Sequence, residues 1–233
     1  LITFPSEPVM ADRLADVIAA QLTAAVLERG RATFAVSGGS TPKNLYRALA
    51  GRDLPWARVD VVLVDERWVE PGEEGSNETF ILDNLMQGHA ASARLTGMKN
   101  AAADPAAGLS QMQACLSAMA FPIDVTVLGM GGDGHTASWF PHAAGLAGAL
   151  DPNGKTPVAA ITAQESAVTG RFLQRMTLTL PPVLASGLVI LMMKGEDKRT
   201  AYEAALADGP VEDMPVRALL RSDSKSVWPC WTA

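Results

Sequence analysis

Four continuous apolar runs constrain the fold of this chain more than any other feature of its sequence. Each run ends in a glycine-rich or charged segment, and segments with apolar residues at helical spacing lie between them. The runs cover residues 32–36, 59–64, 123–128 and 187–193. Strands in which apolar residues run on rather than alternate with polar ones are typical of parallel sheets whose two faces are both covered. We therefore expect an α/β fold, with a mostly parallel sheet and helices on both faces.

Helical periodicity predicts the elements between these strands. We expect helices at 8–29, 44–49, 78–86, 105–119 and 199–207, with Gly30 ending the first and Pro42 in the first turn of the second. Further strands are expected at 157–161, 176–180 and 227–231, and loops at 70–76 and 151–156. No repeat or linker divides the 233 residues, and α/β folds of this length commonly form one domain. We therefore expect a single domain over residues 1–233.

The charge of the chain limits its partners. The net charge is −6, whereas affinity for nucleic acid or anionic membranes requires clustered Lys and Arg. Cys115 and Cys230 have no metal-ligand spacing, so we expect two buried thiols and neither a zinc site nor a disulfide. The sequence has no signal-peptide pattern and no apolar stretch of about 18 residues. We expect a cytoplasmic protein, although a chain that begins at Leu1 leaves a removed leader open.

Polar or glycine-rich segments follow each of the four apolar runs. They are residues 37–41, 65–67, 129–135 and 194–198. Ligands of open parallel sheets bind beyond the carboxyl ends of the strands, where turns and helix N-termini present free N–H groups. If the four strands are parallel, one cleft at this edge of the sheet holds all four segments.

The first of these segments, Ser37-Gly-Gly-Ser-Thr-Pro42, has the chemistry of a phosphate site. Gly38 and Gly39 allow a close approach of the backbone, and the hydroxyls of Ser37, Ser40 and Thr41 can donate to an anion at a helix N-terminus. The same residues also fit an ordinary turn in which Ser40 or Thr41 caps the helix. Both interpretations stay open from this segment alone.

Charged residues at 65–67 are unusual at the end of a buried strand, because burying charge is costly. One explanation is an internal ion pair between Asp65 and Arg67. The other is that Arg67 faces an anion or a developing oxyanion, which a fixed guanidinium stabilises through charge-assisted hydrogen bonds.

The segment from Gly129 to Gly134 matches G-x-G-x-x-G, the dinucleotide-binding pattern. Asp133 argues against that function, because it would bring a negative charge to a pyrophosphate, and Pro141 comes too soon for the long helix required. The glycines instead predict a tight loop that presents Asp133 and His135. An imidazole with an ordinary pKa of about 6.5 can accept a proton from water, and a carboxylate can fix its tautomer. We expect His135 to be functional.

Five segments carry a resemblance that covers nearly the whole chain. In order, they are Ser37-Gly-Gly-Ser-Thr-Pro42, Asp65-Glu-Arg67 with Ser76-Asn77, Gly131-Gly-Asp-Gly-His-Thr-Ala-Ser138, Arg175-Met-Thr-Leu-Thr-Leu-Pro181 and Gly195-Glu-Asp-Lys198. Together they resemble the glucosamine-6-phosphate isomerase/6-phosphogluconolactonase family, and within it the lactonases. The resemblance implies a modified Rossmann-like fold and hydrolysis of 6-phospho-D-glucono-1,5-lactone to 6-phosphogluconate in the oxidative pentose phosphate pathway. It implies no metal or organic cofactor, and a monomer.

Site roles follow from the same resemblance. His135 becomes the general base that activates water, Asp133 the residue that orients it, and Arg67 the group that stabilises the oxyanion. Substrate binding falls to residues 37–41, Asp65 and Lys198. Arg175 is a weaker candidate for the phosphate, for which Arg171 and Lys194 compete.

Two alternatives differ from this interpretation at particular positions. The related deaminases carry Asp-Glu-Tyr where this chain has Asp65-Glu66-Arg67, and an acidic residue five positions after the histidine, where this chain has Phe140. A non-catalytic sugar-phosphate sensor would carry an additional helix-turn-helix segment and often lacks the histidine or arginine. This chain has neither the tyrosine nor the acidic residue of the deaminases, and it keeps both the histidine and the arginine that the sensors often lack. These differences favour the lactonase.

Overall fold

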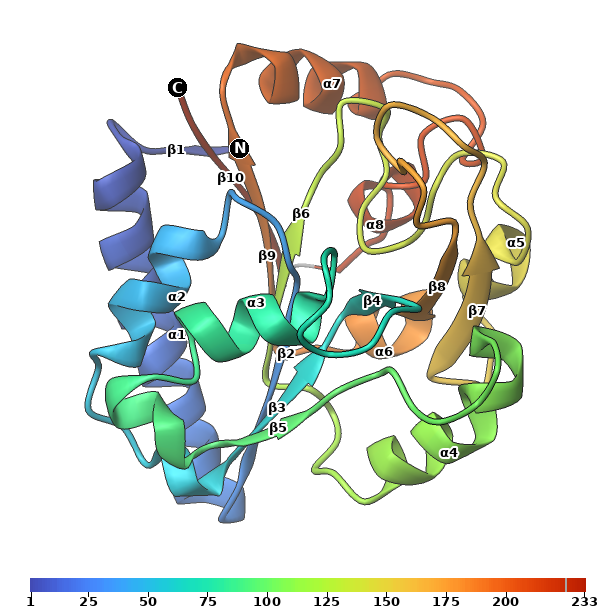
Figure 1. Ribbon diagram of the computed structural model, residues 1–233. Coiled ribbons are helices and arrows are strands. Elements are labelled where there is room, and N and C mark those ends of the chain that lie inside the picture. Colours follow the sequence, from blue (N-terminus) through green and yellow to red (C-terminus); the bar gives the residue numbers. More distant parts are fainter. Residues whose placement is uncertain (225) are drawn as a thin grey trace.

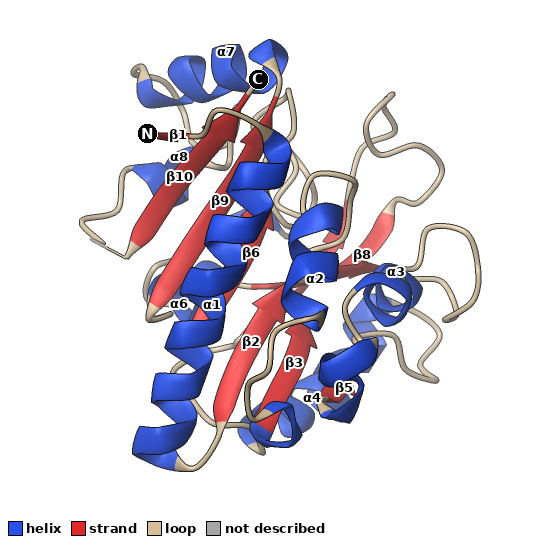
Figure 2. Ribbon diagram, turned by 90° about the vertical axis from the view of Figure 1, so that its left-hand side faces the viewer, coloured by secondary structure: helices blue, strands red, loops and turns tan. Residues whose placement is uncertain are grey.

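A seven-stranded sheet in which every neighbouring pair is parallel forms the centre of the computed structural model, which describes residues 1–224 and 226–233. Its order is β1-β10-β9-β6-β2-β3-β5 (Figures 1 and 2). The strands are β1 (Ile2–Thr3), β2 (Ala32–Val36), β3 (Val59–Leu63), β5 (Arg94–Thr96), β6 (Val125–Gly129), β9 (Leu188–Lys194) and β10 (Val227–Thr232). The predicted mostly parallel α/β fold is confirmed, and only the very short β1 and β5 were not expected.

Continuous burial explains why these strands lie at the centre. Every residue of β2 and β3 is buried, and β6 and β9 are buried except at their last residue. Figure 2 shows α1 (Glu7–Arg29) in front of the central strands and α6 (Leu180–Leu184) behind them, so helices cover both faces. Gly30 ends α1 in the left-handed conformation, with φ of +79°, as predicted.

The remaining helices are all shorter than α1. They are α2 (Lys43–Ala50), α3 (Asn77–Asn84), α4 (Pro105–Ser117), α5 (Leu146–Ala149), α7 (Glu196–Leu206) and α8 (Arg217–Leu220), with 3-10 turns at Trp56–Arg58 and Gly88–Ser92. The position before α2 is Pro42, and among the described residues no side chain caps this helix. The interpretation of Ser40 or Thr41 as a capping residue is therefore wrong.

A second, antiparallel sheet was not predicted. It has the order β4-β8-β7, with β4 (Asp65–Arg67), β8 (Gln174–Leu178) and β7 (Val158–Thr162). Val64 links the two sheets, because its N–H donates to the carbonyl of Val36 in the parallel sheet (2.8 Å) and its carbonyl accepts from the N–H of Leu178 (2.7 Å). Three charged residues show no apolar alternation, so the sequence gives no strand signal at β4.

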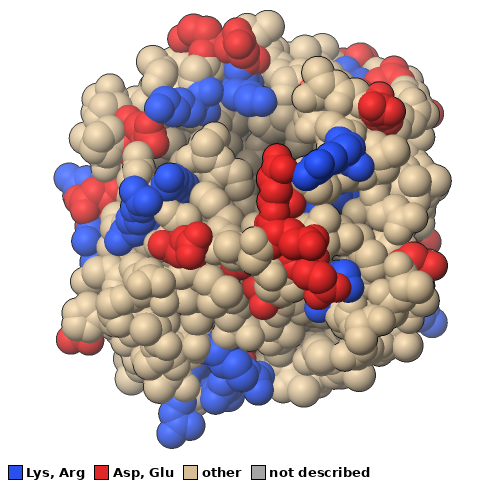
Figure 3. Space-filling view, viewed as in Figure 1, with Lys and Arg blue, Asp and Glu red and all other residues tan. Residues whose placement is uncertain are grey.

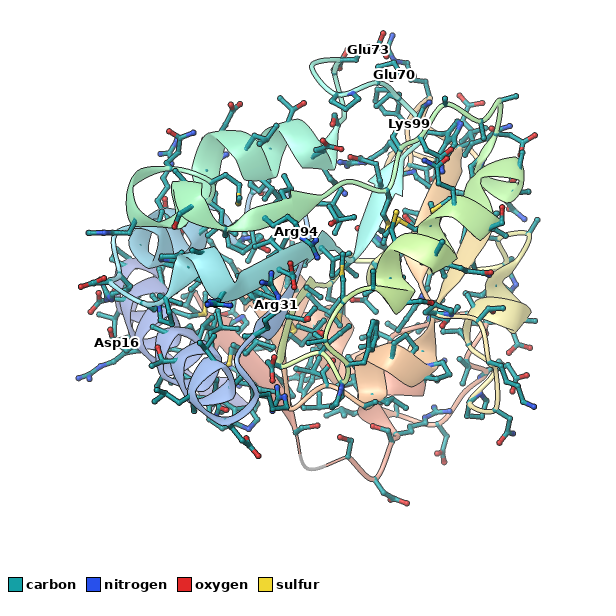
Figure 4. All side chains as sticks on the ribbon, turned by 90° about the horizontal axis from the view of Figure 1, so that it is seen from below. Asp16, Arg31, Glu70, Glu73, Arg94 and Lys99 are labelled. Carbon is teal, nitrogen blue, oxygen red and sulfur yellow. The ribbon has the colours of Figure 1, made fainter. Side chains whose placement is uncertain are left out.

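Buried charge at the amino ends of the strands has a structural role. Asp60 of β3 is 1% exposed and pairs with Arg31 (2.8 Å) and Arg94 (2.7 Å). Figure 4 shows these two arginines close together in the view from below. Two guanidinium groups compensate the buried carboxylate, so this end of the sheet is closed by ion pairs.

The structure also bears on the expectations for the cysteines and for membrane-spanning segments. Cys230 in β10 is buried, but Cys115 on α4 is exposed, so the prediction of two buried thiols is wrong for Cys115. None of the helices among the described residues is long and apolar enough to cross a membrane. The organisation as a single domain stays a prediction.

Candidate active site

A cavity of about 420 Å³ lies at the carboxyl ends of the central strands. Its walls contain all four of the segments that follow the predicted strands, and the lining residues are Ser37, Gly38, Gly39, Ser40, Thr41, Pro42, Asp65, Arg67, Asn77, Gly129, Met130, Gly131, His135, Ala137, Phe140, Val168, Arg175 and Lys198. Figure 3 shows that basic and acidic side chains both gather around the hollow on this face. The structure thus brings every predicted site residue to the cavity wall except Asp133, which stands behind His135.

The glycine-rich loop after β6 fixes a histidine–carboxylate pair. Nδ1 of His135 lies 2.6 Å from Oδ1 of Asp133. The loop is closed by hydrogen bonds from the Gly131 N–H to the carbonyl of His135 (2.8 Å) and from the Gly134 N–H to the carbonyl of Gly131 (3.1 Å). A Cβ on Gly131 would clash with the imidazole, so glycine is required there. Asp133 therefore holds one ring nitrogen and leaves Nε2 on the side of the cavity.

Electrostatics keep Asp133 ionised. Burial raises the pKa of its carboxyl group, but the hydrogen bond and the charge of His135 act in the opposite direction, and the net pKa is lowered. Because the ionised carboxylate only accepts hydrogen bonds, Nδ1 of His135 must carry the proton. Nε2 is then unprotonated in the neutral ring and can act as a base.

The aromatic ring of Phe140 packs against the His135 imidazole. Its ring centroid lies 4.5 Å from that of His135, with an angle of 31° between the rings, and the Arg175 guanidinium lies over the same aromatic side chain at 5.0 Å. In the sequence, Phe140 only distinguishes the lactonases from the deaminases, and no local pattern predicts that it contacts both residues.

The turn after β2 presents polar groups without internal partners. Ser37 is 5% exposed, and its buried Oγ has no hydrogen-bond partner among the described residues. Gly39 has a φ of +100°, and Gly38 packs so tightly that a Cβ there would clash with the side chain of Asn77. Lys198, in the first turn of α7, places Nζ 4.0 Å from where a Cβ on Gly132 would be. These groups form the basic and hydroxyl-rich part of the wall.

Asp65 and Arg67 form no ion pair within the described part of the chain, so the internal-pair explanation is wrong. Asp65 instead accepts from the hydroxyl of Ser138 at 2.6 Å. The Arg67 Nη1 donates to the carbonyl of Gly75 (3.0 Å) and to Oδ1 of Asn77, while its buried Nε has no hydrogen-bond partner among residues 1–224 and 226–233. The guanidinium is thus held at one end and retains an unsatisfied donor.

The three candidates for an additional phosphate-binding cation, Arg175, Arg171 and Lys194, lie in different parts of the molecule. Arg175 is 3% exposed in the cavity wall and donates from Nε to the carbonyl of Phe172 (2.6 Å). Burial lowers the pKa of Arg175 to about 10. Arg171 pairs with Glu74 at the surface (2.7 Å), and Lys194 pairs with Glu7. Only Arg175 of the three lines the cavity.

Asn77 lines the cavity, although the sequence did not predict it as a site residue. It was noted only as part of a matching segment, yet it donates from Nδ2 to the carbonyl of Asp65 (2.8 Å) and accepts from Arg67. Its position directly after the capping residue of α3, Ser76, was the available signal. His89 and His142 are both exposed.

Comparisons with known proteins agree with the geometry. The model of the family "Glucosamine-6-phosphate isomerases/6-phosphogluconolactonase" matches residues 5–228. The chain is 40% identical over 228 residues to the 6-phosphogluconolactonase of Rhizobium meliloti, covering 98% of this chain and 96% of the relative. It is 38% identical to the enzyme of that name from Pseudomonas aeruginosa, with 92% and 88% covered.

Solved structures give the same result at the level of the fold. The crystal structure of a 6-phosphogluconolactonase from Shewanella baltica has a TM-score of 0.93 and 37% identity, covering 100% of this chain and 97% of that one. A monomeric glucosamine-6-phosphate deaminase has a TM-score of 0.79 at 19% identity, with 99% and 96% covered. At that identity the likeness concerns the fold alone.

Proposed function

The chain belongs to the glucosamine-6-phosphate isomerase/6-phosphogluconolactonase family, and from this premise we propose that it hydrolyses 6-phospho-D-glucono-1,5-lactone to 6-phosphogluconate. One observation carries the proposal: the His135–Asp133 pair faces a cavity that also contains Arg67 and the turn at 37–41. A base, an oxyanion donor and a phosphate cradle in one cavity are the requirements for hydrolysis of a phosphorylated lactone.

The reaction begins with the activation of water. Nε2 of His135 takes a proton from a water molecule while the oxygen of that water attacks the lactone carbonyl carbon. Asp133 keeps the proton on Nδ1 and stabilises the imidazolium that forms. General-base catalysis of this kind typically contributes about 10²–10⁴-fold.

Arg67 stabilises the oxyanion of the tetrahedral intermediate. Its Nε is buried and has no partner among the described residues, so a donor is available before the substrate arrives. When the intermediate collapses, the bond between the carbonyl carbon and the ring oxygen breaks. The imidazolium returns its proton to the leaving oxygen, and 6-phosphogluconate carries the new carboxylate.

The substrate phosphate binds at the turn after β2. The phosphate dianion needs charge and hydrogen-bond donors. The Oγ of Ser37, which has no partner in the described part of the chain, the N–H groups of Gly38 and Gly39, and the ammonium of Lys198 together provide them. Arg175 lies in another part of the wall, against Phe140 and opposite Arg67 in the β4–β8 pairing. We assign Arg175 to the lactone end of the substrate.

Phe140 favours the lactonase over the deaminase. Ring opening and amine release need an additional acid–base group beside the histidine, whereas the residue that contacts the His135 imidazole here is aromatic. A hydrolysis that uses a single base does not need that group. The finer expectations, a monomer in the cytoplasm, belong to the same proposal.

A coupled assay tests the function directly. Purified protein is supplied with freshly made lactone or with glucosamine 6-phosphate, and the rate above spontaneous hydrolysis is measured. We expect turnover of the lactone only, and a loss of orders of magnitude in His135→Ala. His142→Ala is the matched control, because His142 also lies near an aspartate, Asp213 (3.1 Å), but outside the cavity. Full activity of His135→Ala would contradict the mechanism.

A further inference from the structure

Glu66 is a completely buried carboxyl group that the proposed mechanism does not use. It lies in β4 between Asp65 and Arg67, and both of these neighbours line the cavity while Glu66 does not. Successive side chains of a strand point to opposite sides, so the Glu66 side chain projects away from the cavity. Burying an ionisable group is costly, and such a position needs a physical reason.

The Glu66 carboxyl group accepts hydrogen bonds from Arg67 in its own strand and from three residues at the start of α3. Oε1 accepts from the backbone N–H of Arg67 (2.8 Å) and of Asn77 (2.7 Å). Oε2 accepts from the N–H of Glu78 (2.8 Å) and, at 3.4 Å, from the hydroxyl of Ser76. The N–H groups in the first turn of a helix have no partner within the helix, so this one carboxylate ties β4 to the start of α3.

The segment that Glu66 ties down is the one that aims Arg67. The guanidinium of Arg67 donates to the carbonyl of Gly75 and to Oδ1 of Asn77, which flank Ser76. Asn77 is further fixed by its bond from Nδ2 to the carbonyl of Asp65 (2.8 Å). Glu66 therefore sets the backbone of Arg67 and, through Asn77, the position of its side chain.

We propose that Glu66 is a positioning residue that fixes the start of α3 and thereby aims the Arg67 guanidinium at the reacting carbonyl. The proposal rests on the function proposed above, in which Arg67 stabilises the oxyanion. No Lys or Arg side chain in the described part of the chain forms an ion pair with Glu66. Its role is therefore to accept hydrogen bonds from the backbone N–H groups of Arg67 and the start of α3.

Glu66→Gln is the main test, assayed above the pKa of about 7 to which burial raises the Glu66 carboxyl group, so that the wild-type side chain is an ionised acceptor. The amide keeps the size of the side chain but puts an NH₂ donor against backbone N–H donors. We expect kcat for the lactone to fall about tenfold or more, below the roughly 10²–10³-fold cost of removing an oxyanion donor outright, and KM to change little. Glu78→Gln is the matched control, since this side chain lies against Gly97 and outside the cavity. Wild-type kcat in Glu66→Gln would overturn the proposal.

A double-mutant cycle separates positioning from general stability. If Glu66 acts through Arg67, adding Glu66→Gln to Arg67→Ala lowers kcat little further. An equal fold loss in both backgrounds would mean a merely structural role and would overturn the proposal. Should Glu66→Gln fail to fold, Glu66→Asp, which keeps the charge but shortens the reach, enters the same cycle with the same two outcomes.

A crystal structure makes the test independent of the substrate. In Glu66→Gln or Glu66→Asp we expect the Arg67 guanidinium to leave the Gly75 carbonyl and Asn77. A guanidinium that stays in place would overturn the proposal even if the enzyme acts on another compound. Wild-type protein that fails to hydrolyse the lactone would contradict the proposed function alone, because the position of Arg67 does not depend on that assay.

Discussion

Oδ1 of Asp133 lies 2.6 Å from Nδ1 of His135, and the two residues are separated only by Gly134. This contact fixes the ring tautomer, because the carboxylate can only accept. It also explains the glycines of the loop, since a Cβ on Gly131 would clash with the imidazole and one on Gly134 would lie 2.8 Å from Met214. The segment that matches the dinucleotide-binding pattern therefore serves to hold the His135 imidazole in place.

The first prediction concerns the tautomer. In Asp133→Asn the amide can donate to Nδ1, which moves the ring proton to Nε2 and removes the base. We expect kcat to fall about 10²–10⁴-fold with KM little changed and the fold retained, measured by steady-state kinetics and circular dichroism. Asp213→Asn, at the other His–Asp contact, is the control and should keep wild-type kcat. An unchanged kcat in Asp133→Asn would remove Asp133 from the mechanism.

The second prediction concerns the phosphate. Lys198→Ala removes a charge-assisted contact that exists equally in the ground and transition states, so KM should rise about tenfold to a hundredfold while kcat stays nearly constant. Lys194→Ala is the matched control, because Lys194 pairs with Glu7 away from the cavity. If KM responds to Lys194→Ala and not to Lys198→Ala, the phosphate site is misplaced.

Sequence patterns predicted the parts of the molecule that local chemistry determines. Continuous Val, Ile and Leu runs fix buried parallel strands, and the turn after each strand must then lie at one edge. The place of Arg175 depends instead on long-range pairing, because only the antiparallel register of β8 with β4 sets it opposite Arg67. Arg171, four positions earlier, lies outside β8 and pairs with Glu74 at the surface. Phe140 likewise enters the cavity through tertiary contacts that no local pattern reports, and the only local signal for Asn77 is its position after the capping residue Ser76.

The third prediction tests the close contact between the turn and Asn77. A Cβ in Gly38→Ala would clash with Oδ1 of Asn77, the atom that accepts from Arg67, so the asparagine must move. We expect KM to rise and kcat to fall together, each about tenfold, because the phosphate turn and the Arg67 acceptor are both displaced. Gly148→Ala, where a Cβ meets no atom within 4 Å and which lies outside the cavity, is the control. Kinetic constants equal to wild type in Gly38→Ala would contradict this coupling.

The last prediction concerns stability and follows from the burial of Glu66. Burial raises the pKa of Glu66 from 4.5 to about 7, although hydrogen bonds from Asn77, Glu78 and Arg67 oppose the rise. The folded protein therefore binds a proton that the unfolded chain has lost between about pH 4.5 and 7. The contribution of Glu66 to the free energy of unfolding must then decrease as the pH rises through this window. A shift of one pKa unit corresponds to roughly 1.4 kcal/mol, so the whole decrease is about 3 kcal/mol.

Urea unfolding of wild type and Glu66→Gln at several pH values between about 5 and 8 measures this contribution. Gln does not titrate, so the other carboxyl groups and histidines cancel in the difference between the two proteins. We expect the stability of wild type relative to Glu66→Gln to decline as the pH rises, with the steepest change near the pKa of Glu66. A difference that stays constant over this range would mean that Glu66 titrates like an exposed carboxylate. The donor network at the start of α3 would then be strong enough to outweigh its burial.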